Sequence, residues 1–244
     1  MDIFKRSDKI KSFECGADNA QRPDSLLSWI MDAAEDHATL LGFGREFCEE
    51  KNLAWVEYRL SVSIARLPRW KEAVEVSTWT APVSPLIATR DFLMKSASGE
   101  TLVQSSCQWV LINAARRRPV PLRREIPSLM NETMTPFFPD PFEVRMPSGM
   151  FLARSFYSEW HNIDFNGHTN NAVYLIWALD ALPSGWMKTH RLRGIEIGFV
   201  KETFPGTKVD VLWKQECHRT WHAVVADGSE RALLRLEWDM AADD

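Results

Sequence analysis

Three polar side chains that could take part in catalysis are spaced two residues apart in the second half of the chain. They are a carboxylate, an amide and an imidazole: Asp164, Asn166 and His168. A carboxylate or an imidazole can move a proton, and an amide can donate a hydrogen bond to a reacting carbonyl. Asp-Phe-Asn-Gly is also common turn chemistry. A turn explains Asp164, Asn166 and Gly167, but it does not require the histidine, so both interpretations stay open here.

An apolar run follows this motif at once and predicts the element that positions it. Residues 172–179 read Ala-Val-Tyr-Leu-Ile-Trp-Ala-Leu, and Asn170 or Asn171 can cap the start of a helix over 171–182. Pro183 follows the expected end of that helix. The polar motif is therefore expected at the entry to an apolar helix, where its side chains can point towards an apolar substrate.

The two halves of the chain have the same predicted order of elements. In the first half, an apolar pattern at helical spacing runs from Leu26 to Leu41, with Asp24 or Ser25 as the candidate cap. Alternating strand patterns follow over residues 58–64, 74–79, 86–95 and 101–112. In the second half, strand patterns follow the helix over residues 195–199, 209–213, 220–226 and 231–239. A long helix followed by a meander of strands, twice over, predicts an α+β fold with a sheet wrapped around a helix in each half.

The halves differ at positions that could do chemistry. Aligning Asp18 with Asp164 brings the two predicted helix starts into register, and no histidine accompanies Asp18. Glu202 ends a predicted strand, and the comparable position of the first half is Ala65 or Arg66. A carboxylate therefore occurs only in the half that also has the histidine. Glu202 becomes a candidate partner of the motif, although a solvated strand end is the simpler interpretation.

Proline marks a boundary between the halves. Seven of the thirteen prolines lie between Pro119 and Pro147, and proline suits neither a helix interior nor a central strand. The predicted organisation is a first domain over 1–130, a linker over 131–150 and a second domain over 151–244. Two groups of arginines near this boundary form either a solvated surface or an electrostatic dock for an acidic macromolecule: Arg116, Arg117, Arg118, Arg123 and Arg124.

Composition excludes several classes of protein. The 244 residues are 45% hydrophobic and carry a formal net charge of −4, which argues for a packed core and against a nucleic-acid binder. The four cysteines form no Cys-x-x-Cys pair and are predicted to be reduced thiols. His161 has no set of further ligands at close spacing, so no metal is expected. The chain has neither a signal-peptide pattern nor an apolar run of membrane-spanning length, which predicts a cytoplasmic protein.

The motif and its surroundings resemble the acyl-acyl-carrier-protein thioesterases of plants and bacteria. In the second half, the resemblance rests on residues 164–171, Tyr174 and the run 177–183. In the first half, it rests on residues 32–38, 64–70, 90–92 and 109–112 and on the arginine-rich segment after them. The resemblance implies two tandem hot-dog domains, each a long central helix wrapped by a curved antiparallel sheet. It also implies release of free fatty acid from acyl-acyl carrier protein without a cofactor.

The resemblance further implies roles for particular residues. The catalytic positions of the family map onto Asp164, Asn166, His168 and Glu202. Water is the expected nucleophile, because Thr203 stands where plant enzymes often have a cysteine.

In that scheme Glu202 is the general base, Asp164 holds His168 or Asn166, and backbone N–H groups at the start of the 171–182 helix stabilise the oxyanion. The first domain is expected to hold the acyl chain, and the arginine groups are expected to contact the acidic carrier protein. The candidate substrate-binding residues are Leu26, Trp29, Ile30, Ala33, Asn170 and Asn171.

Other functions stay open on the sequence. The first is an acyl-CoA thioesterase of the hot-dog fold, and the second is a non-enzymatic protein that binds acyl thioesters. A dehydratase of the same double fold is a third, and its substrate would need a β-hydroxyl group. Two fused hot-dog domains already supply the pairing that single domains obtain by dimerising, so a monomer and a homodimer both agree with the sequence.

Overall fold

The computed structural model divides the chain into two compact units, residues 1–141 and 142–244. The structure describes residues 3–81, 84–131, 135–139 and 145–241. The predicted domain limits at 130 and 151 lie on either side of this division, and the linker over 131–150 stays a prediction.

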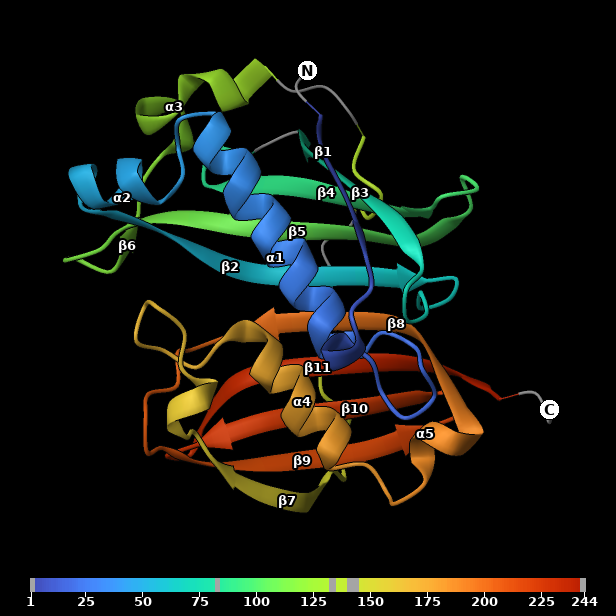
Figure 1. The fold of residues 1–244 in the computed structure, drawn as a ribbon. Coiled ribbons are helices and arrows are strands. Elements are labelled where there is room, and N and C mark those ends of the chain that lie inside the picture. Colours follow the sequence, from blue (N-terminus) through green and yellow to red (C-terminus); the bar gives the residue numbers. More distant parts are fainter. Residues whose placement is uncertain (1–2, 82–83, 132–134, 140–144, 242–244) are drawn as a thin grey trace. The chain divides into compact units, whose positions relative to one another are not determined.

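In the first unit, one long helix lies across one face of an antiparallel sheet (Figure 1). The strands pair in the order β1-β3-β4-β5-β2, and the short β6 adds to β5. The strands are β1 (Phe4–Lys9), β2 (Leu53–Ile64), β3 (Ala73–Ala81), β4 (Ile87–Ser96), β5 (Thr101–Asn113) and β6 (Arg118–Pro119). The helices are α1 (Pro23–Leu40), α2 (Arg45–Lys51) and α3 (Leu122–Glu125), with 3-10 turns at Ser12–Glu14 and Pro127–Asn131.

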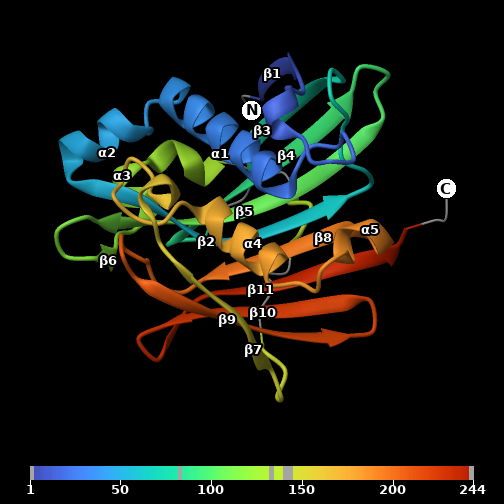
Figure 2. The same cartoon turned by 60° about the horizontal axis from the view of Figure 1, so that its bottom comes forward.

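The second unit repeats this plan. Its sheet has the antiparallel order β8-β11-β10-β9-β7, and α4 lies across it (Figure 2). The strands are β7 (Phe151–Tyr157), β8 (His190–Phe199), β9 (Lys208–Glu216), β10 (Arg219–Ala226) and β11 (Ser229–Met240). The helices are α4 (Asn171–Asp180) and α5 (Trp186–Thr189), with a 3-10 turn at Trp160–Asn162. Each of the predicted strands overlaps an observed one, because side chains that alternate between core and surface favour strands.

The start of α1 differs from the prediction. The helix begins at Pro23, and neither Asp24 nor Ser25 caps it; the cap position is Arg22, which makes no side-chain cap hydrogen bond. Proline at the first helical position has the required φ and lacks an N–H that would otherwise need a partner. Asp24 lies in the first turn and forms an ion pair with Arg22 at 3.1 Å.

The sequence reasoning missed β1, which pairs with β3 at the edge of the first sheet. Its basic side chains are used in ion pairs: Lys5 with Glu75 at 3.0 Å, and Arg6 with Asp36 at 3.1 Å. An edge strand made mostly of charged residues lacks the apolar pattern that reveals a buried strand. Charged side chains on an edge strand are a common protection against aggregation.

A segment of the predicted linker is bound to the outer side of the first sheet. The Asp91 carboxylate accepts hydrogen bonds from Ser106 Oγ at 2.5 Å and from Phe137 N at 3.0 Å, and Phe138 N donates to Ser106 Oγ at 3.3 Å. The Phe137 ring meets Trp79 edge to face at 5.5 Å. Asp91 is fully buried, and burial raises the pKa of its carboxyl group. Residues 137 and 138 are therefore held by a specific polar anchor.

The described part of the chain contains no helix with the length and apolar character needed to cross a membrane.

The core of the second unit contains a histidine that should make stability depend on pH. His222 is fully buried beside Trp213, and burial lowers its pKa from 6.5 to about 3. The unfolded chain therefore binds a proton between these values while the folded chain does not. Stability is fully present above pH 6.5 and is lost as the pH falls towards 3. At pH 5, 1.5 units below the unfolded pKa, the expected loss is about 2 kcal/mol.

Urea unfolding at pH 7 and pH 5 checks this prediction. His222→Gln keeps a hydrogen-bonding group for Thr220, which lies 3.0 Å from His222 Nε2, and removes the titration. The wild type should lose about 2 kcal/mol more than the variant between the two pH values. An equal loss in both proteins would show that His222 does not carry the effect.

Candidate active site

The polar motif of the second half folds into a tight turn before α4. Ile163 and Thr169 form an isolated antiparallel bridge, and Asp164 N donates to the His168 carbonyl at 2.9 Å. Gly167 has a φ of 79°, a region that glycine enters without strain. The turn interpretation therefore describes the backbone correctly, and the chemistry depends on where the side chains point.

Asp164 directs its carboxylate into the turn itself. Oδ1 accepts from Asn166 N at 2.8 Å and from His168 N at 3.3 Å, and Oδ2 accepts from Asn166 Nδ2 at 3.3 Å. Of the two tasks expected for Asp164, holding the Asn166 side chain agrees with these contacts. Its contact with His168 is to the backbone.

His168 and Glu202 meet across the loop that follows β8. Their closest atoms, His168 Nδ1 and Glu202 Oε1, are 3.5 Å apart, and the side chains are 26% and 27% exposed. Glu202 comes three residues after the end of β8 at Phe199. The pair is thus sheltered but open to a substrate and water. The two side chains form a candidate acid–base pair, although they lie 34 residues apart in the sequence.

Hydrogen bonds to Thr203 connect the loop that contains Glu202 to the turn that contains His168 and to helix α4. Its carbonyl accepts from Thr169 N at 2.8 Å, and its hydroxyl accepts from Tyr174 Oη at 3.0 Å. Thr203 is 1% exposed. The Glu202 carbonyl also accepts from Arg231 Nη1 at 3.1 Å. The backbone around Glu202 is therefore held on both sides by buried groups.

The first unit contains the same backbone framework. In the second unit, the hydrogen bonds run from Asp164 N to His168 O, Gly167 N to Asp164 O, Thr169 N to Thr203 O and Asn170 N to Asn162 O. In the first unit, they run from Gly16 N to Ala20 O, Asn19 N to Gly16 O, Gln21 N to Pro68 O and Arg22 N to Glu14 O. All eight lie between 2.8 and 3.1 Å. The two loops can therefore be matched residue by residue.

This match corrects the alignment made from sequence. Asp18 corresponds to Asn166 and not to Asp164, and Glu202 corresponds to Leu67 rather than to Ala65 or Arg66. In place of the four polar residues of the second unit, Asp164, Asn166, His168 and Glu202, the first unit has Gly16, Asp18, Ala20 and Leu67. The same backbone thus forms without the histidine and without the two acids, so the fold does not require them.

The start of α4 does not offer the oxyanion donors that were expected there. Asn170 caps the helix: its side-chain Oδ1 accepts from Ala172 N at 2.8 Å, and its carbonyl accepts from Val173 N at 2.9 Å. Asn170 N donates to Asn162 O at 2.8 Å. These amides are already paired, so the expected role of the helix N–H groups is not supported by the hydrogen bonding. Asn170 has a structural task, and the substrate contacts of Asn170 and Asn171 stay predictions.

Three large aromatic side chains stand exposed near the His168–Glu202 pair in sequence. Trp160 is 89% exposed, Phe165 is 69% exposed and Phe204 is 51% exposed. The Phe204 ring meets the His168 ring edge to face at 5.1 Å. Phe204 therefore limits the positions that the imidazole can take.

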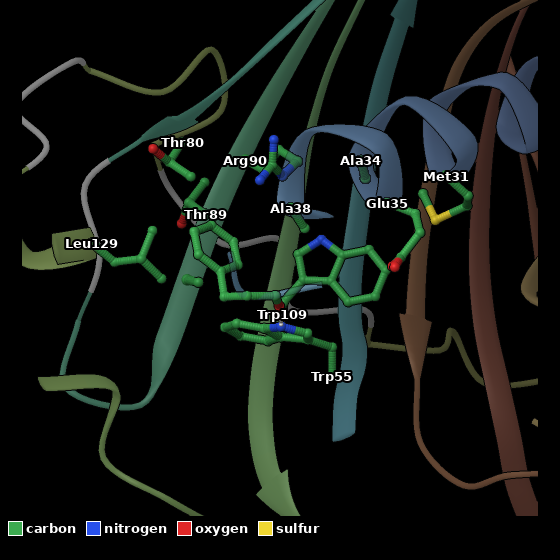
Figure 3. A pocket seen from close by; sticks show the side chains of 12 residues that line it. Met31, Ala34, Glu35, Ala38, Trp55, Thr80, Thr89, Arg90, Trp109 and Leu129 are labelled. Atoms are coloured by element: carbon green, nitrogen blue, oxygen red, sulfur yellow. Dashed lines mark hydrogen bonds between the residues drawn. The ribbon is translucent and has the colours of Figure 1, made fainter. Parts of the chain in front are cut away.

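A pocket of the first unit lies between α1 and the sheet (Figure 3). Its empty volume is about 490 Å³, open solvent at the mouth included. Most of the lining is apolar, and Arg90 is the buried charged group in it. The lining residues are Met31, Ala34, Glu35, Ala38, Phe43, Trp55, Thr80, Ala88, Thr89, Arg90, Trp109 and Leu129.

The four α1 residues proposed from sequence as acyl contacts do not line this pocket. Leu26, Trp29, Ile30 and Ala33 are all buried, and Trp29 Nε1 donates to Glu14 Oε1 at 2.6 Å. The pocket uses a neighbouring stripe of the helix, at residues 31, 34, 35 and 38. Sequence periodicity could not separate the two stripes, because α1 is apolar on more than one side. An acyl-binding role of the four residues stays a prediction.

The arginine groups lie at the end of the first sheet and just after it. Arg116 and Arg117 are exposed on the turn between β5 and β6, and Arg118 is exposed on β6. Arg123 and Arg124 are exposed on α3. Arg124 forms an exposed ion pair with Glu125 at 3.2 Å. Their exposure allows contact with a macromolecule.

Within the residues that the structure describes, no three or more His, Cys, Asp or Glu side chains gather in a way that could hold a metal ion. The four cysteines are free thiols.

Family models match most of the chain. Residues 1–130 match the acyl-ACP thioesterase N-terminal domain, and residues 148–240 match the acyl-ACP thioesterase C-terminal domain. A chloroplastic acyl-[acyl-carrier-protein] hydrolase of Cuphea viscosissima is 27% identical over 260 residues, which cover 96% of this chain and 62% of that protein. A chloroplastic palmitoyl-acyl carrier protein thioesterase of Gossypium hirsutum is 28% identical over 255 residues, covering 96% and 60%. The chain thus spans about three-fifths of the length of these relatives.

Solved structures share the fold. An acyl-ACP thioesterase from Bacteroides thetaiotaomicron superposes with a TM-score of 0.89 at 22% identity, over 97% of this chain and 98% of that one. The 12:0-ACP thioesterase of Umbellularia californica gives a TM-score of 0.85 at 24% identity, over 98% of both chains. These matches confirm the predicted α+β fold of hot-dog type.

Proposed function

Since the chain belongs to the acyl-ACP thioesterase family, we propose that it hydrolyses the thioester of acyl-acyl carrier protein and releases free fatty acid in fatty acid biosynthesis. The observation that carries this proposal is the His168–Glu202 pair beside the Asp164–Asn166 turn. The first unit builds the same backbone without these groups, so their presence in the second unit points to chemistry.

Glu202 is the proposed general base. Its carboxylate takes a proton from water, and the water oxygen forms a bond to the thioester carbonyl carbon. The carbon–sulfur bond then breaks, and the thiolate leaves with a proton delivered through His168, whose Nδ1 lies 3.5 Å from Glu202 Oε1. The products are a carboxylic acid and the free thiol of the carrier. Water is the nucleophile, because the Thr203 hydroxyl is buried and bonded to Tyr174.

Asn166 is the proposed donor to the carbonyl oxygen. Its Nδ2 is held by Asp164 at 3.3 Å, a long bond that leaves the second N–H of the amide for a substrate. A side-chain donor is favoured because the backbone N–H groups of residues 172 and 173 are already paired. The partial positive charge at the start of α4 adds to the stabilisation of the developing oxyanion.

The apolar pocket of the first unit is the proposed place of the acyl chain, and the exposed arginines are the proposed contact for the carrier protein. The alternatives are hydrolysis of acyl-CoA and binding of acyl thioesters without hydrolysis. A cytoplasmic location is proposed from the sequence, whereas the curated relatives are named as chloroplastic. We also propose that the protein can form a homodimer, and analytical ultracentrifugation would measure its oligomeric state.

Release of thiol from one acyl chain on two carriers tests the function. The wild type should hydrolyse the carrier-protein thioester with a higher kcat/KM than the CoA thioester. Reversing the charges of Arg116, Arg117 and Arg118 to glutamate should raise KM for the protein-bound substrate alone. Three exposed ion pairs at roughly 0.2–1 kcal/mol each correspond to a roughly 3- to 140-fold change in KM, and added salt should make this change smaller.

Lys188 and Arg191, exposed residues of the second unit, supply a matched control when they are changed to glutamate. Their reversal should leave KM for both carriers unchanged. Equal kcat/KM on the two carriers would favour an acyl-CoA enzyme, and tight binding of acyl thioester without thiol release would favour a binding protein. An unchanged KM in the triple variant would remove these arginines from the interface.

A further inference from the structure

A buried arginine of the second unit is bound to the loop that carries the proposed general base. Arg231 lies on β11 and is 5% exposed. Its Nη1 donates to the Glu202 carbonyl at 3.1 Å. Its own carbonyl accepts from the backbone N–H groups of residues 200 and 201, at 2.9 and 3.2 Å. The backbone and the side chain of Arg231 therefore both hold the segment over 200–202.

The guanidinium of Arg231 is also bound to the turn between β10 and β11. Its Nη2 donates to the Ala226 carbonyl at 3.3 Å and to Asp227 Oδ2 at 3.0 Å. Asp227 and Gly228 have φ angles of 51° and 69°, as in the tight turns that join two antiparallel strands. Arg231 thus connects the Glu202 loop to a hairpin turn that the pairing of β10 with β11 holds in place.

The first unit has a leucine at the position of Arg231. In the second unit, Val200 N donates to the Arg231 carbonyl at 2.9 Å. In the first unit, Ala65 N donates to the Leu102 carbonyl, also at 2.9 Å. The backbone framework that the two units share pairs Val200 with Ala65, so Leu102 is the counterpart of Arg231. Leu102 is fully buried, and its side chain has no group that could donate to the loop.

The two units therefore differ together at two positions. The first unit has leucine at both, Leu67 and Leu102. The second unit has a carboxylate and a cation, Glu202 and Arg231. The backbone forms with leucine at the strand position, and burying an arginine is costly unless its donors are bonded. The buried arginine occurs in the unit that has the carboxylate, and it is bonded to the backbone that carries this carboxylate.

We propose that Arg231 is a positioning residue for thioester hydrolysis, and that it keeps the Glu202 carboxylate where it can reach both His168 and the attacking water. The inference rests on the proposed function, because it takes Glu202 as the general base. Catalysis by a positioned group is sensitive to a displacement of about 1 Å. The carbonyls of Glu202 and Thr203 each accept a hydrogen bond that fixes the loop, and removal of the guanidinium would abolish the first of these bonds.

Replacing Arg231 by leucine, the residue of the first unit, tests the proposal. Arg231→Leu should lower kcat for the thioester by about 10- to 100-fold, as expected for a misplaced catalytic group, and should keep KM within about twofold. Arg231→Lys should recover part of kcat, because an ammonium can still donate to the carbonyl. Arg193→Leu is the matched control. It removes an arginine of β8 that pairs with Asp239 at 2.7 Å, and it should leave kcat unchanged.

The same substitution in the Glu202→Gln background separates positioning from a general loss of structure. If Arg231 acts through Glu202, Arg231→Leu should lower kcat no further once the carboxylate is gone. An equal loss of kcat in both backgrounds would overturn the proposal, and so would wild-type kcat in folded Arg231→Leu protein. If Arg231→Leu does not fold, Arg231→Gln takes its place, because glutamine is polar, uncharged and shorter, and the same two outcomes decide.

Hydrogen exchange of one backbone amide gives a readout that needs no substrate. Thr169 N donates to the Thr203 carbonyl at 2.8 Å. Its counterpart in the first unit, Gln21 N, donates to the Pro68 carbonyl at 2.8 Å. Arg231→Leu should speed exchange at Thr169 by about 10-fold, since a hydrogen bond from a charged group no longer holds the loop, and should leave exchange at Gln21 unchanged.

The two readouts separate the positioning role from the proposed function. If the wild type hydrolyses no acyl thioester, the proposed function fails, and exchange at Thr169 still decides whether Arg231 holds the loop. Unchanged exchange at Thr169 in Arg231→Leu protein would contradict the positioning role, whatever the activity of the wild type.

Discussion

Replacing Glu202 by glutamine should lower kcat for thioester hydrolysis by about 10²–10⁴-fold, the usual contribution of a general base. Glutamine has nearly the same shape and cannot take a proton from water. The change should affect kcat more than KM, because Glu202 acts on the attacking water and the pocket of the first unit is untouched. Steady-state kinetics on the preferred carrier thioester give both parameters.

Glu230→Gln provides the control, since it removes an exposed carboxylate from the same unit and should leave kcat unchanged. Circular dichroism of both variants checks that they fold. His168→Ala belongs to the same experiment, because His168 Nδ1 is 3.5 Å from Glu202. If Glu202→Gln and His168→Ala both retain near-wild-type kcat on folded protein, the assignment of this pair is wrong.

The fold was largely predictable from the sequence. The core strands alternate in polarity, and the second half repeats the order of the first, so the pattern of one half supports the other. The edge strand β1 was not predicted because most of its side chains are charged and exposed, and some of them form surface ion pairs, such as Lys5 with Glu75. Its stability comes from pairing with β3, which local sequence does not encode.

The candidate catalytic side chains could be chosen from the sequence by residue type, and their roles stay proposals. The spacing of the motif suggested a turn, and the comparison of halves separated the residues that the fold needs from those it does not. The sequence alignment was two residues out of register at Asp18, because only backbone hydrogen bonds define equivalent turn positions. The sequence also did not show that the backbone N–H groups of residues 172 and 173 donate hydrogen bonds to Asn170, because these bonds depend on the geometry of the helix start.

The pocket lining could not be predicted, because α1 carries apolar residues on more than one stripe. Arg90 did give a signal: it is a charged residue inside a strand whose neighbours on the same face are buried. A charge at such a position is uncommon without a partner. The second unit has a cluster of polar side chains on a turn, and the first has a charge inside its pocket, so the two copies of the fold differ in where they place polar groups.

Replacing Asp164 by alanine should lower kcat by about 10²-fold, the order of effect expected when a catalytic group is displaced by about 1 Å. The Asp164 carboxylate accepts from the backbone N–H groups of Asn166 and His168 and from the Asn166 side chain. Alanine removes all three acceptor contacts, so the amide and the imidazole lose their fixed positions. The turn itself should persist, because the first unit forms it with Gly16 at this place.

Asp164→Asn distinguishes positioning from a direct electrostatic role. Asparagine keeps an oxygen that can accept from the two backbone N–H groups, but it has no charge. If Asp164 acts by shaping the turn, Asp164→Asn should keep kcat within about tenfold of the wild type while Asp164→Ala does not. Equal losses in both variants would mean that the negative charge acts on the reacting groups. In that case Asp164 contributes to the proton transfer that we propose for His168 and Glu202, whose side chains lie 3.5 Å apart.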